Sequence, residues 1–113
     1  MSKNPLVSVI VLNYNAGELL LNCIESIKKS AYKNLEIIVV DNISTDKSQK
    51  ACKEKYPDIK LIQNNENFGY CEGNNIGIRE AEGDYIIILN PDTIVESNCI
   101  EEWKCRYLKR CTS

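Results

Sequence analysis

The chain has 113 residues, 43% of them hydrophobic and 27% charged, a composition that suits one globular domain spanning residues 1–113. Its net charge of −2, with 14 basic and 16 acidic residues interspersed, argues against nucleic-acid binding. No apolar run approaches the roughly 20 residues of a membrane span, and the N-terminus lacks a signal peptide's apolar stretch, so a cytoplasmic location is expected.

The first expected element is a strand over Leu6–Leu12, which is β-branched and almost continuously apolar. This pattern is typical of a strand buried on both faces of a parallel sheet. Asn15 is then expected to cap a helix ending near Ser30, with Glu18 three residues after the cap. Its apolar stripe is formed by Leu20, Cys23, Ile24 and Ile27.

A second strand and helix follow. Leu35–Val40 repeats the buried-strand pattern. Ser44 or Thr45 is expected to cap a helix that runs to about Tyr56, because Pro57 cannot continue it.

The last part of the chain adds two strands and two helices. Ile59–Gln63 reads as an edge strand, Asn64–Gly73 as a loop, and Asn74–Ala81 as a third helix. Tyr85–Leu89 is the fourth expected strand. Beyond it, apolar residues at helical spacing predict a last amphipathic helix, namely Val95, Cys99, Ile100, Trp103 and Tyr107.

Alternating strands and helices predict an α/β, Rossmann-like, mostly parallel sheet with helices on both faces. If the short third strand is an edge, the economical strand order is 3-2-1-4. The chain then changes direction between strands 1 and 4, and ligands of open α/β sheets collect at such a switch point, beyond the carboxyl ends of the strands.

The six cysteines are expected to be reduced and structural. None has C-x-x-C spacing, and the chain has no histidine, the commonest partner in a zinc site. Cys23, Cys52 and Cys99 fall on apolar faces of expected helices, where a thiol acts as a small hydrophobe.

Polar residues end three of the strands. They are Asn13-Tyr14-Asn15, Asp41-Asn42 and Asn90-Pro91-Asp92. Turn chemistry alone accounts for any one of these segments, since Asn, Asp and Pro also terminate strands for local reasons. Convergence of all three at one sheet edge favours a binding site.

At these positions the sequence resembles the family 2 glycosyltransferases, whose donor-binding half has the GT-A architecture. The resemblance extends to about Trp103 and rests on four motifs in order. They are Val7 to Asn15, Val39-Val40-Asp41-Asn42 with Ser44-Thr45-Asp46, Asn74-Asn75-Ile76-Gly77-Ile78, and Gly83-Asp84-Tyr85 leading to Leu89-Asn90-Pro91-Asp92-Thr93.

The resemblance implies a nucleotide-sugar site. Tyr14 would lie against the base, and Asp41 would accept a hydrogen bond from a base N–H or the ribose. The segment from Asn67 to Asn75 would close over the ribose and diphosphate, where glycine permits close approach and a helix N-terminus favours an anion. The implied nucleotide-binding residues are Asn13, Tyr14, Asp41, Asn67, Gly73, Asn74 and Asn90.

The resemblance also implies a Mg²⁺ or Mn²⁺ cofactor. Asn90-Pro91-Asp92 matches the family's D-x-D position, with the first carboxylate replaced by an amide. Asp92 is the expected metal ligand, and Asn90 would supply a carbonyl oxygen or hold a metal-bound water. A hard cation held by oxygen ligands neutralises the charge that develops on the leaving diphosphate.

The implied function is transfer of a glycosyl group from a nucleotide-diphosphate sugar to a hydroxyl of a glycan, lipid or protein, as in cell-wall or polysaccharide synthesis. No catalytic residue is identifiable, because inverting members take their base from a segment downstream of the donor half. Glu96, Glu101 and Glu102 fit a solvated helix face instead. We therefore expect a truncated GT-A fold, with the donor half present and the acceptor half absent, and an exposed flank that promotes self-association.

The predicted fold is shared by three other classes of protein. A non-catalytic nucleotide-binding module fits the same donor residues. A dinucleotide-dependent oxidoreductase needs G-x-G-x-x-G after the first strand, which Asn13-Tyr14-Asn15-Ala16-Gly17 does not provide. A phosphoacceptor receiver domain could use Asp41, but it would need an acidic cluster and a lysine at other strand ends.

Overall fold

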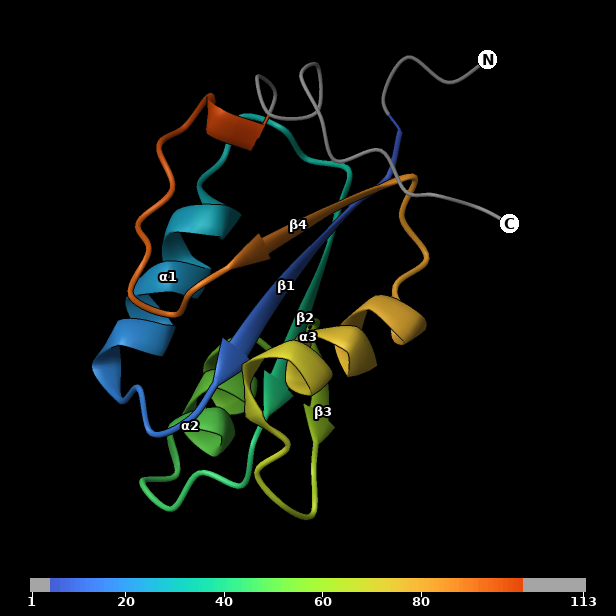
Figure 1. The fold of residues 1–113 in the computed structure, drawn as a ribbon. Coiled ribbons are helices and arrows are strands. Elements are labelled where there is room, and N and C mark those ends of the chain that lie inside the picture. The colour runs from blue at the N-terminus through green and yellow to red at the C-terminus, as the bar shows by residue number, and fades with distance from the viewer. Residues whose placement is uncertain (1–4, 101–113) are drawn as a thin grey trace.

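The computed structural model describes residues 5–100, which form one layered α/β unit (Figure 1). Seven helices and strands follow one another in the described part of the chain. They are β1 (Val7–Asn13), α1 (Glu18–Lys28), β2 (Leu35–Asp41), α2 (Ser48–Lys55), β3 (Lys60–Gln63), α3 (Gly69–Glu80) and β4 (Tyr85–Leu89).

The four strands form a parallel sheet in the order β3-β2-β1-β4, which confirms the predicted topology. The pairing of β1 with β2 continues to Asn13 and Asp41, whereas the pairing of β1 with β4 ends at Val11 and Leu89. The edge of the sheet is therefore stepped at the carboxyl ends, with β1 extending two residues beyond its last pair with β4.

Alternation along the strands fills a core on each face of the sheet. Val9 and Val39 join the face covered by α1 and α2, whereas Ile10 and Ile38 face α3 (Figure 1). All four side chains have no exposed surface. The predicted apolar stripe of α1 is confirmed, since Leu20, Cys23, Ile24 and Ile27 are all buried.

Two glycines bring α3 close to the sheet. A Cβ at Gly73 would lie 2.6 Å from Leu12 Cδ1, and a Cβ at Gly77 would lie 2.7 Å from Ile10 Cγ2. Real Cβ atoms essentially never approach other atoms so closely. Side chains of β1 occupy the space that a Cβ would need at these two positions, so only glycine fits there. The main chain of α3 can therefore approach the strands closely.

The expected start of α1 is wrong. The helix begins at Glu18 after Gly17, whose φ is 60°, and no side chain caps it. Asn15 is engaged elsewhere, because its Oδ1 accepts hydrogen bonds from the backbone N–H groups of Thr45 and Asp46. A long-range contact has replaced the local cap.

The expected cap of α2 is also wrong, by two or three residues, because the N-cap position is Lys47. Ser44 does not cap the helix, because its Oγ accepts hydrogen bonds from the Asn15 N–H and Asn13 Nδ2 while its hydroxyl donates to Asp41. The helix starts at Ser48, whose N–H donates to Asp46 Oδ1 at 2.9 Å. It ends at Lys55, close to the predicted end.

The third helix starts five residues earlier than predicted, at Gly69 instead of Asn74. The prediction treated Gly73 as a loop residue, but this glycine is buried inside the helix against Leu12. Asn67 Oδ1 accepts the N–H of Gly69 at 2.9 Å, so the turn before the helix is held by a side chain.

The last expected helix lies mainly outside the described residues, which include neither Trp103 nor Tyr107. Residues 93–96 have no regular structure, and helical structure appears at residues 99–100. Val95 and Ile100 are buried in the α1–α2 core. In residues 5–100 no helix has the length and apolar character to cross a bilayer.

Two predicted structural cysteines are confirmed as buried free thiols. Cys23 and Cys52 are fully buried, and burial raises the pKa of Cys23 to about 12 and that of Cys52 to about 11. The nearby carboxylate of Asp92 contributes to the rise in the Cys23 pKa. Cys99 is also free and is half-buried.

Candidate functional site

The carboxyl ends of β1 and β2 are joined by a buried pair of polar side chains. Asn13 Nδ2 donates to Asp41 Oδ1 at 2.8 Å, and the two residues are 0% and 1% exposed. They are the last register pair of the two strands. A buried polar group needs such a partner, so the pair fixes how the two loops leave the sheet.

Two serines complete this buried cluster. Ser44 donates to both carboxylate oxygens of Asp41, through its N–H at 2.9 Å and its hydroxyl at 2.7 Å. Asn13 Nδ2 also donates to Ser48 Oγ at 2.9 Å. The Asp41 carboxylate therefore accepts three hydrogen bonds from the β1 end and its own loop.

A second set of hydrogen bonds ties the loop after β1 to the loop after β2. Asn15 Oδ1 accepts the N–H groups of Thr45 and Asp46 at 2.8 and 3.1 Å. In return, Asp46 Oδ2 accepts the N–H of Gly17 at 3.0 Å. The hydrogen bonds from Ser48 lower the pKa of Asp46 below its usual value. We call residues 13–17 and 41–48 the loop pair.

Asn42 connects the loop pair to the start of α3. Its Nδ2 donates to the carbonyl of Gly69 at 3.2 Å, and its Oδ1 accepts Nδ2 of Asn64 at 2.7 Å. The same Nδ2 would lie 3.1 Å from a Cβ at Gly73. Asn67 and Gly73 were predicted to border the same part of the ligand. Asn67 lies before α3 and Gly73 lies within it, and Asn42 anchors the start of this helix.

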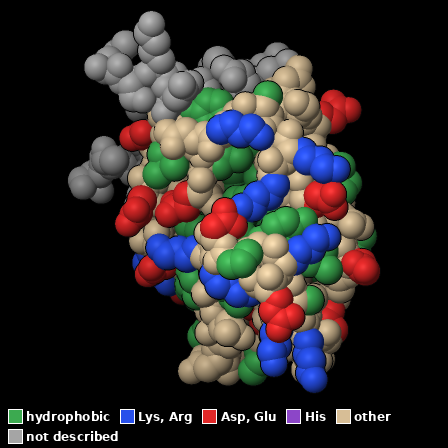
Figure 2. Space-filling view, turned by 180° about the vertical axis from the view of Figure 1, so that it is seen from behind, with side chains coloured by type: hydrophobic (Ala, Val, Ile, Leu, Met, Phe, Trp, Pro, Cys, Tyr) green, Lys and Arg blue, Asp and Glu red, His purple; other side chains and the backbone are tan. Residues whose placement is uncertain are grey.

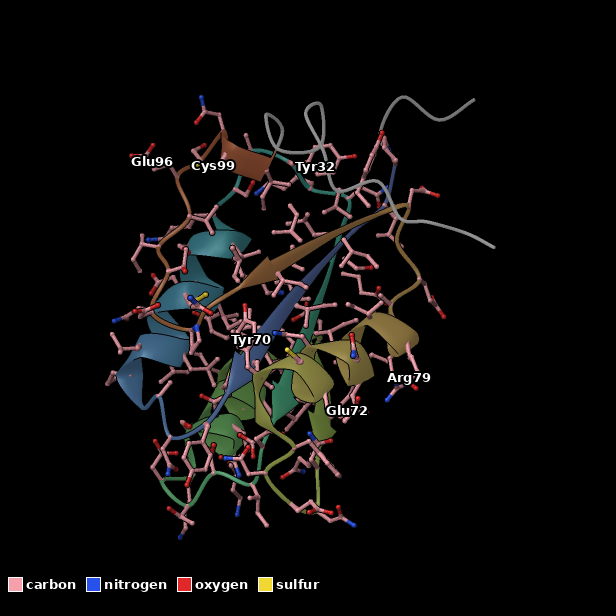
Figure 3. The ribbon with its side chains drawn as sticks, viewed as in Figure 1. Tyr32, Tyr70, Glu72, Arg79, Glu96 and Cys99 are labelled. Carbon is pink, nitrogen blue, oxygen red and sulfur yellow. The ribbon has the colours of Figure 1, made fainter. Side chains whose placement is uncertain are left out.

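Exposed and buried groups alternate at this end of the sheet. Tyr14 is 53% exposed between the anchored residues Asn13 and Asn15. Asn67 is exposed, and so is Tyr70 in the first turn of α3 (Figure 3). These side chains present ring and amide surfaces on a frame held by buried hydrogen bonds.

Asn74 is the predicted residue with an unmet hydrogen-bonding group. It is 4% exposed, and its Oδ1 is buried without a partner. Leaving such an acceptor unpaired costs about 1–3 kcal/mol, so a donor from a ligand or a water would stabilise it.

Asn90 and Asp92 lie on an exposed turn directly after β4. The turn is closed by the Thr93 N–H, which donates to the Asn90 carbonyl at 3.0 Å, and it lies over α1, where Cys23 Sγ is 3.9 Å from the same carbonyl. Since β4 pairs with β1, this turn and the loop pair share one edge of the sheet.

The oxygen ligands of this turn suit a shared cation. In residues 5–100, no group of three His, Cys, Asp or Glu side chains could hold a metal ion alone. One carboxylate and one amide carbonyl, from Asp92 and Asn90, fit a Mg²⁺-type ion that takes its other ligands from phosphates and water.

Sequence reasoning assigned no site role to Asn15, Asn42 and Ser48, although Asn15 and Asn42 belong to the polar strand ends that it identified. The Ser44-Thr45-Asp46 motif carried part of the signal, because Ser, Thr, Asn and Asp side chains commonly bond to nearby backbone. The long-range partners described above lie 22 to 35 residues away, however, and local spacing does not identify such contacts.

A separate groove of about 760 Å³ lies at the opposite end of the strands, between the C-terminal ends of α1 and α2 and the beginnings of β2 and β3. Basic and acidic side chains are interspersed over the back of the molecule (Figure 2). In this groove Lys28 pairs with Asp58, and Lys53 donates to two backbone carbonyls. These mutual contacts give no reason to place the chemistry there.

Comparison with known proteins identifies the family. The sequence profile of Glycosyl transferase family 2 matches residues 8–103. The chain belongs to this family. Its sheet order and helices on both faces match the GT-A, Rossmann-like glycosyltransferase fold.

Two relatives of this family 2 chain are much longer proteins. Glycosyltransferase GlyG of Streptococcus pneumoniae is 39% identical over 101 residues, covering 87% of this chain and 34% of the relative. A teichoic acid poly(glycerol phosphate) polymerase of Staphylococcus epidermidis is 35% identical, covering 83% of this chain and 14% of the relative. The chain thus spans about a third or less of these proteins.

Two solved structures of ligand complexes share the fold. The mannosyltransferase PcManGT from Pyrobaculum calidifontis, in complex with GDP-Man and Mn2+, has a TM-score of 0.72 and 31% identity, covering 80% of this chain and 28% of its own. S. aureus TarS 1-349 in complex with UDP-GlcNAc has a TM-score of 0.79 and 26% identity, covering 85% and 29%.

Proposed function

We propose that this family 2 chain binds a nucleotide-diphosphate sugar at the carboxyl ends of β1, β2 and β4, as the donor site of a glycosyltransferase. The observation that carries the proposal is the loop pair, which presents the exposed Tyr14 beside the chain's switch point between β1 and β4. Ligands of open α/β sheets bind at such a point. The complexes of PcManGT with GDP-Man and of TarS with UDP-GlcNAc support a nucleotide sugar.

Each proposed contact uses a surface or a hydrogen-bonding group that the side chain does not already use within the protein. The Tyr14 ring stacks on the base, while Asn13 holds the loop that carries it. Asp41 Oδ2 accepts the Ser44 N–H and keeps a lone pair for a base N–H or a ribose hydroxyl. The unpaired Oδ1 of Asn74 accepts a hydroxyl or N–H of the donor.

The charged part of the donor lies between α3 and β4 in this proposal. Asn67 and Gly73 border the ribose and diphosphate, beside the first turn of α3. Asp92 and Asn90 hold a Mg²⁺ or Mn²⁺ ion, which neutralises charge on the departing diphosphate. The Mn2+ in the PcManGT complex supports a divalent cation.

The complete reaction in this proposal transfers the glycosyl group to a hydroxyl of a glycan, lipid or protein. The similarity to the teichoic acid poly(glycerol phosphate) polymerase supports a role in cell-wall or polysaccharide synthesis. We assign no general base to residues 5–100, and the chain by itself supplies donor binding. A non-catalytic nucleotide-binding module is the second candidate, favoured by the concentration of the site residues in the donor motifs.

The test is calorimetric titration of the chain with a panel of nucleotide diphosphates and nucleotide sugars, with and without Mn²⁺. We expect binding of at least one diphosphate and no sugar transfer to added acceptors, since a positioned base is worth about 10²- to 10⁴-fold in rate. Absence of binding across the panel would refute the donor site. Robust transfer would refute the division between binding and catalysis.

We also propose self-association and a cytoplasmic location. Ile88 on the edge strand β4 and Ile94 beyond it are 39% and 62% exposed, an apolar flank that a second copy could cover. A monomeric mass in light scattering at roughly tens of micromolar would contradict this. Free Cys23, Cys52, Cys71 and Cys99 support a reducing compartment.

A further inference from the structure

Ile43 has an unusual backbone conformation for its residue type. Its φ is 57°, in the left-handed region. A β-branched side chain at positive φ is a genuine outlier, because its Cβ crowds the backbone, whereas Gly, Asn and Asp adopt this conformation more readily. Such strain persists only where surrounding contacts enforce it.

Hydrogen bonds on both sides of Ile43 enforce the conformation. The preceding residue, Asn42, is 2% exposed and bonds to Gly69 and Asn64. The following residue, Ser44, donates twice to the buried carboxylate of Asp41. The backbone of residue 43 is therefore held at both ends.

The side chain that results is not part of either core. Ile43 is 47% exposed and belongs to neither of the two buried clusters on the faces of the sheet. The strain consequently places an apolar side chain in solvent. Gly or Asn would suit the backbone better and would remove this exposed apolar surface.

Ile43 and Tyr14 occupy corresponding positions in the two segments of the loop pair. Just before them, the Asn42 N–H donates to the Asn13 carbonyl at 2.9 Å, and just after them, the Asn15 N–H donates to Ser44 Oγ at 2.9 Å. The two large exposed hydrophobic residues thus occupy corresponding positions on adjacent, cross-linked segments.

We propose that Ile43 is a nucleobase-contacting residue, which together with Tyr14 forms the apolar surface that receives the base of a nucleoside diphosphate. The inference rests on the proposed function and adds a residue to that site. An aromatic ring and a branched aliphatic group both pack well against the flat face of a base, and their attached backbones need no ordering on binding.

The test compares thermal unfolding and calorimetric binding for four variants, using the nucleoside diphosphate that the unmodified chain binds best. Ile43→Gly and Ile43→Asn relieve the strain and remove the apolar contact, whereas Ile43→Leu keeps an apolar side chain. Leu19→Asn is the control, because Leu19 is also an exposed apolar residue, 51% exposed, but lies in α1 outside the loop pair.

The expected result is a divergence between stability and affinity. Ile43→Gly and Ile43→Asn raise the unfolding midpoint by about 3 °C and weaken binding about fivefold. Ile43→Leu stays within about twofold of the unmodified affinity, and Leu19→Asn leaves the affinity unchanged.

Two results would overturn the inference while leaving the donor site intact. One is unchanged affinity in Ile43→Gly and Ile43→Asn. The other is weaker binding in Ile43→Gly alone, which would indicate a flexible loop instead of a lost contact. If the unmodified chain binds no nucleoside diphosphate, the proposed function and this inference both fall.

Discussion

Asn13 Nδ2 lies 2.8 Å from Asp41 Oδ1, where the last register pair of β1 and β2 meets the loops that follow. Because both residues are buried, this contact links the geometry of the sheet to the geometry of the candidate site. A substitution of either side chain should therefore alter the positions of the exposed residues Tyr14 and Ile43.

Asp41→Asn should destabilise the chain by about 2 kcal/mol, because the new amide turns a donor toward Ser44 or Asn13, which already donate to this position. Urea unfolding measures the loss. Asp58→Asn is the control, since Asp58 forms an exposed ion pair with Lys28 and its replacement should cost less than about 1 kcal/mol. Equal effects of the two changes would contradict a structural role for Asp41.

Asp92→Ala should abolish the strengthening of nucleotide diphosphate binding by Mn²⁺, and Asn90→Ala should reduce it less, because a carboxylate is the stronger ligand of a hard cation. Calorimetry with and without Mn²⁺ measures both. Asp84→Ala, at the other end of β4, should leave the metal effect unchanged. Metal-independent binding by the unmodified chain would refute the assignment.

Gly77→Ala should destabilise the fold by about 1–3 kcal/mol, although alanine ordinarily stabilises a helix relative to glycine. The reason is the new Cβ, which would lie 2.7 Å from Ile10 Cγ2 and 3.0 Å from Val40 Cγ2. Asn75→Ala, exposed on the same helix, should be neutral or slightly stabilising. A stabilising Gly77→Ala would show that α3 can move away from the sheet.

The stabilising contribution of Asp46 should be lost in acid. Hydrogen bonds from Ser48 and Gly17 lower the pKa of Asp46 in the folded chain below its ordinary value. A lowered folded pKa means that the stabilisation is complete above the unfolded value and disappears as the pH falls through the folded value.

The free energies of unfolding of the unmodified chain and of Asp46→Asn should therefore differ by a constant amount from about pH 7 to pH 5. This difference in free energy should shrink below about pH 4. Urea titrations at several pH values measure it. A difference that already disappears near pH 6 would point to another titrating group.

The strands were predictable because their signal is local. Apolar runs such as Leu35–Val40 specify a buried strand without reference to the rest of the chain, and the resulting order is confirmed. Helix starts were not predictable for the opposite reason. Asn15 has the side chain of a good cap, but Thr45 and Asp46, 30 and 31 residues away, compete for its oxygen.

The site was predictable to a similar extent. Strand-end polarity correctly indicated that Asn13 and Asp41 meet, as the hydrogen bond between them confirms. Gly73 was interpreted as a loop residue, because its close contact with Leu12 exists only in three dimensions. The strained backbone of Ile43 could not be predicted from the sequence either, because it follows from the hydrogen bonds of the neighbouring residues Asn42 and Ser44.

The stepped edge of the sheet gives the proposed donor a direction. β1 extends two residues beyond its last pair with β4, a height difference of about 7 Å at roughly 3.3 Å per residue. A nucleotide lying across the step would place its base against Tyr14, directly after the longer strand β1. The proposed cation ligands Asn90 and Asp92 follow the shorter strand β4, so the step separates the proposed base contact from the proposed cation site.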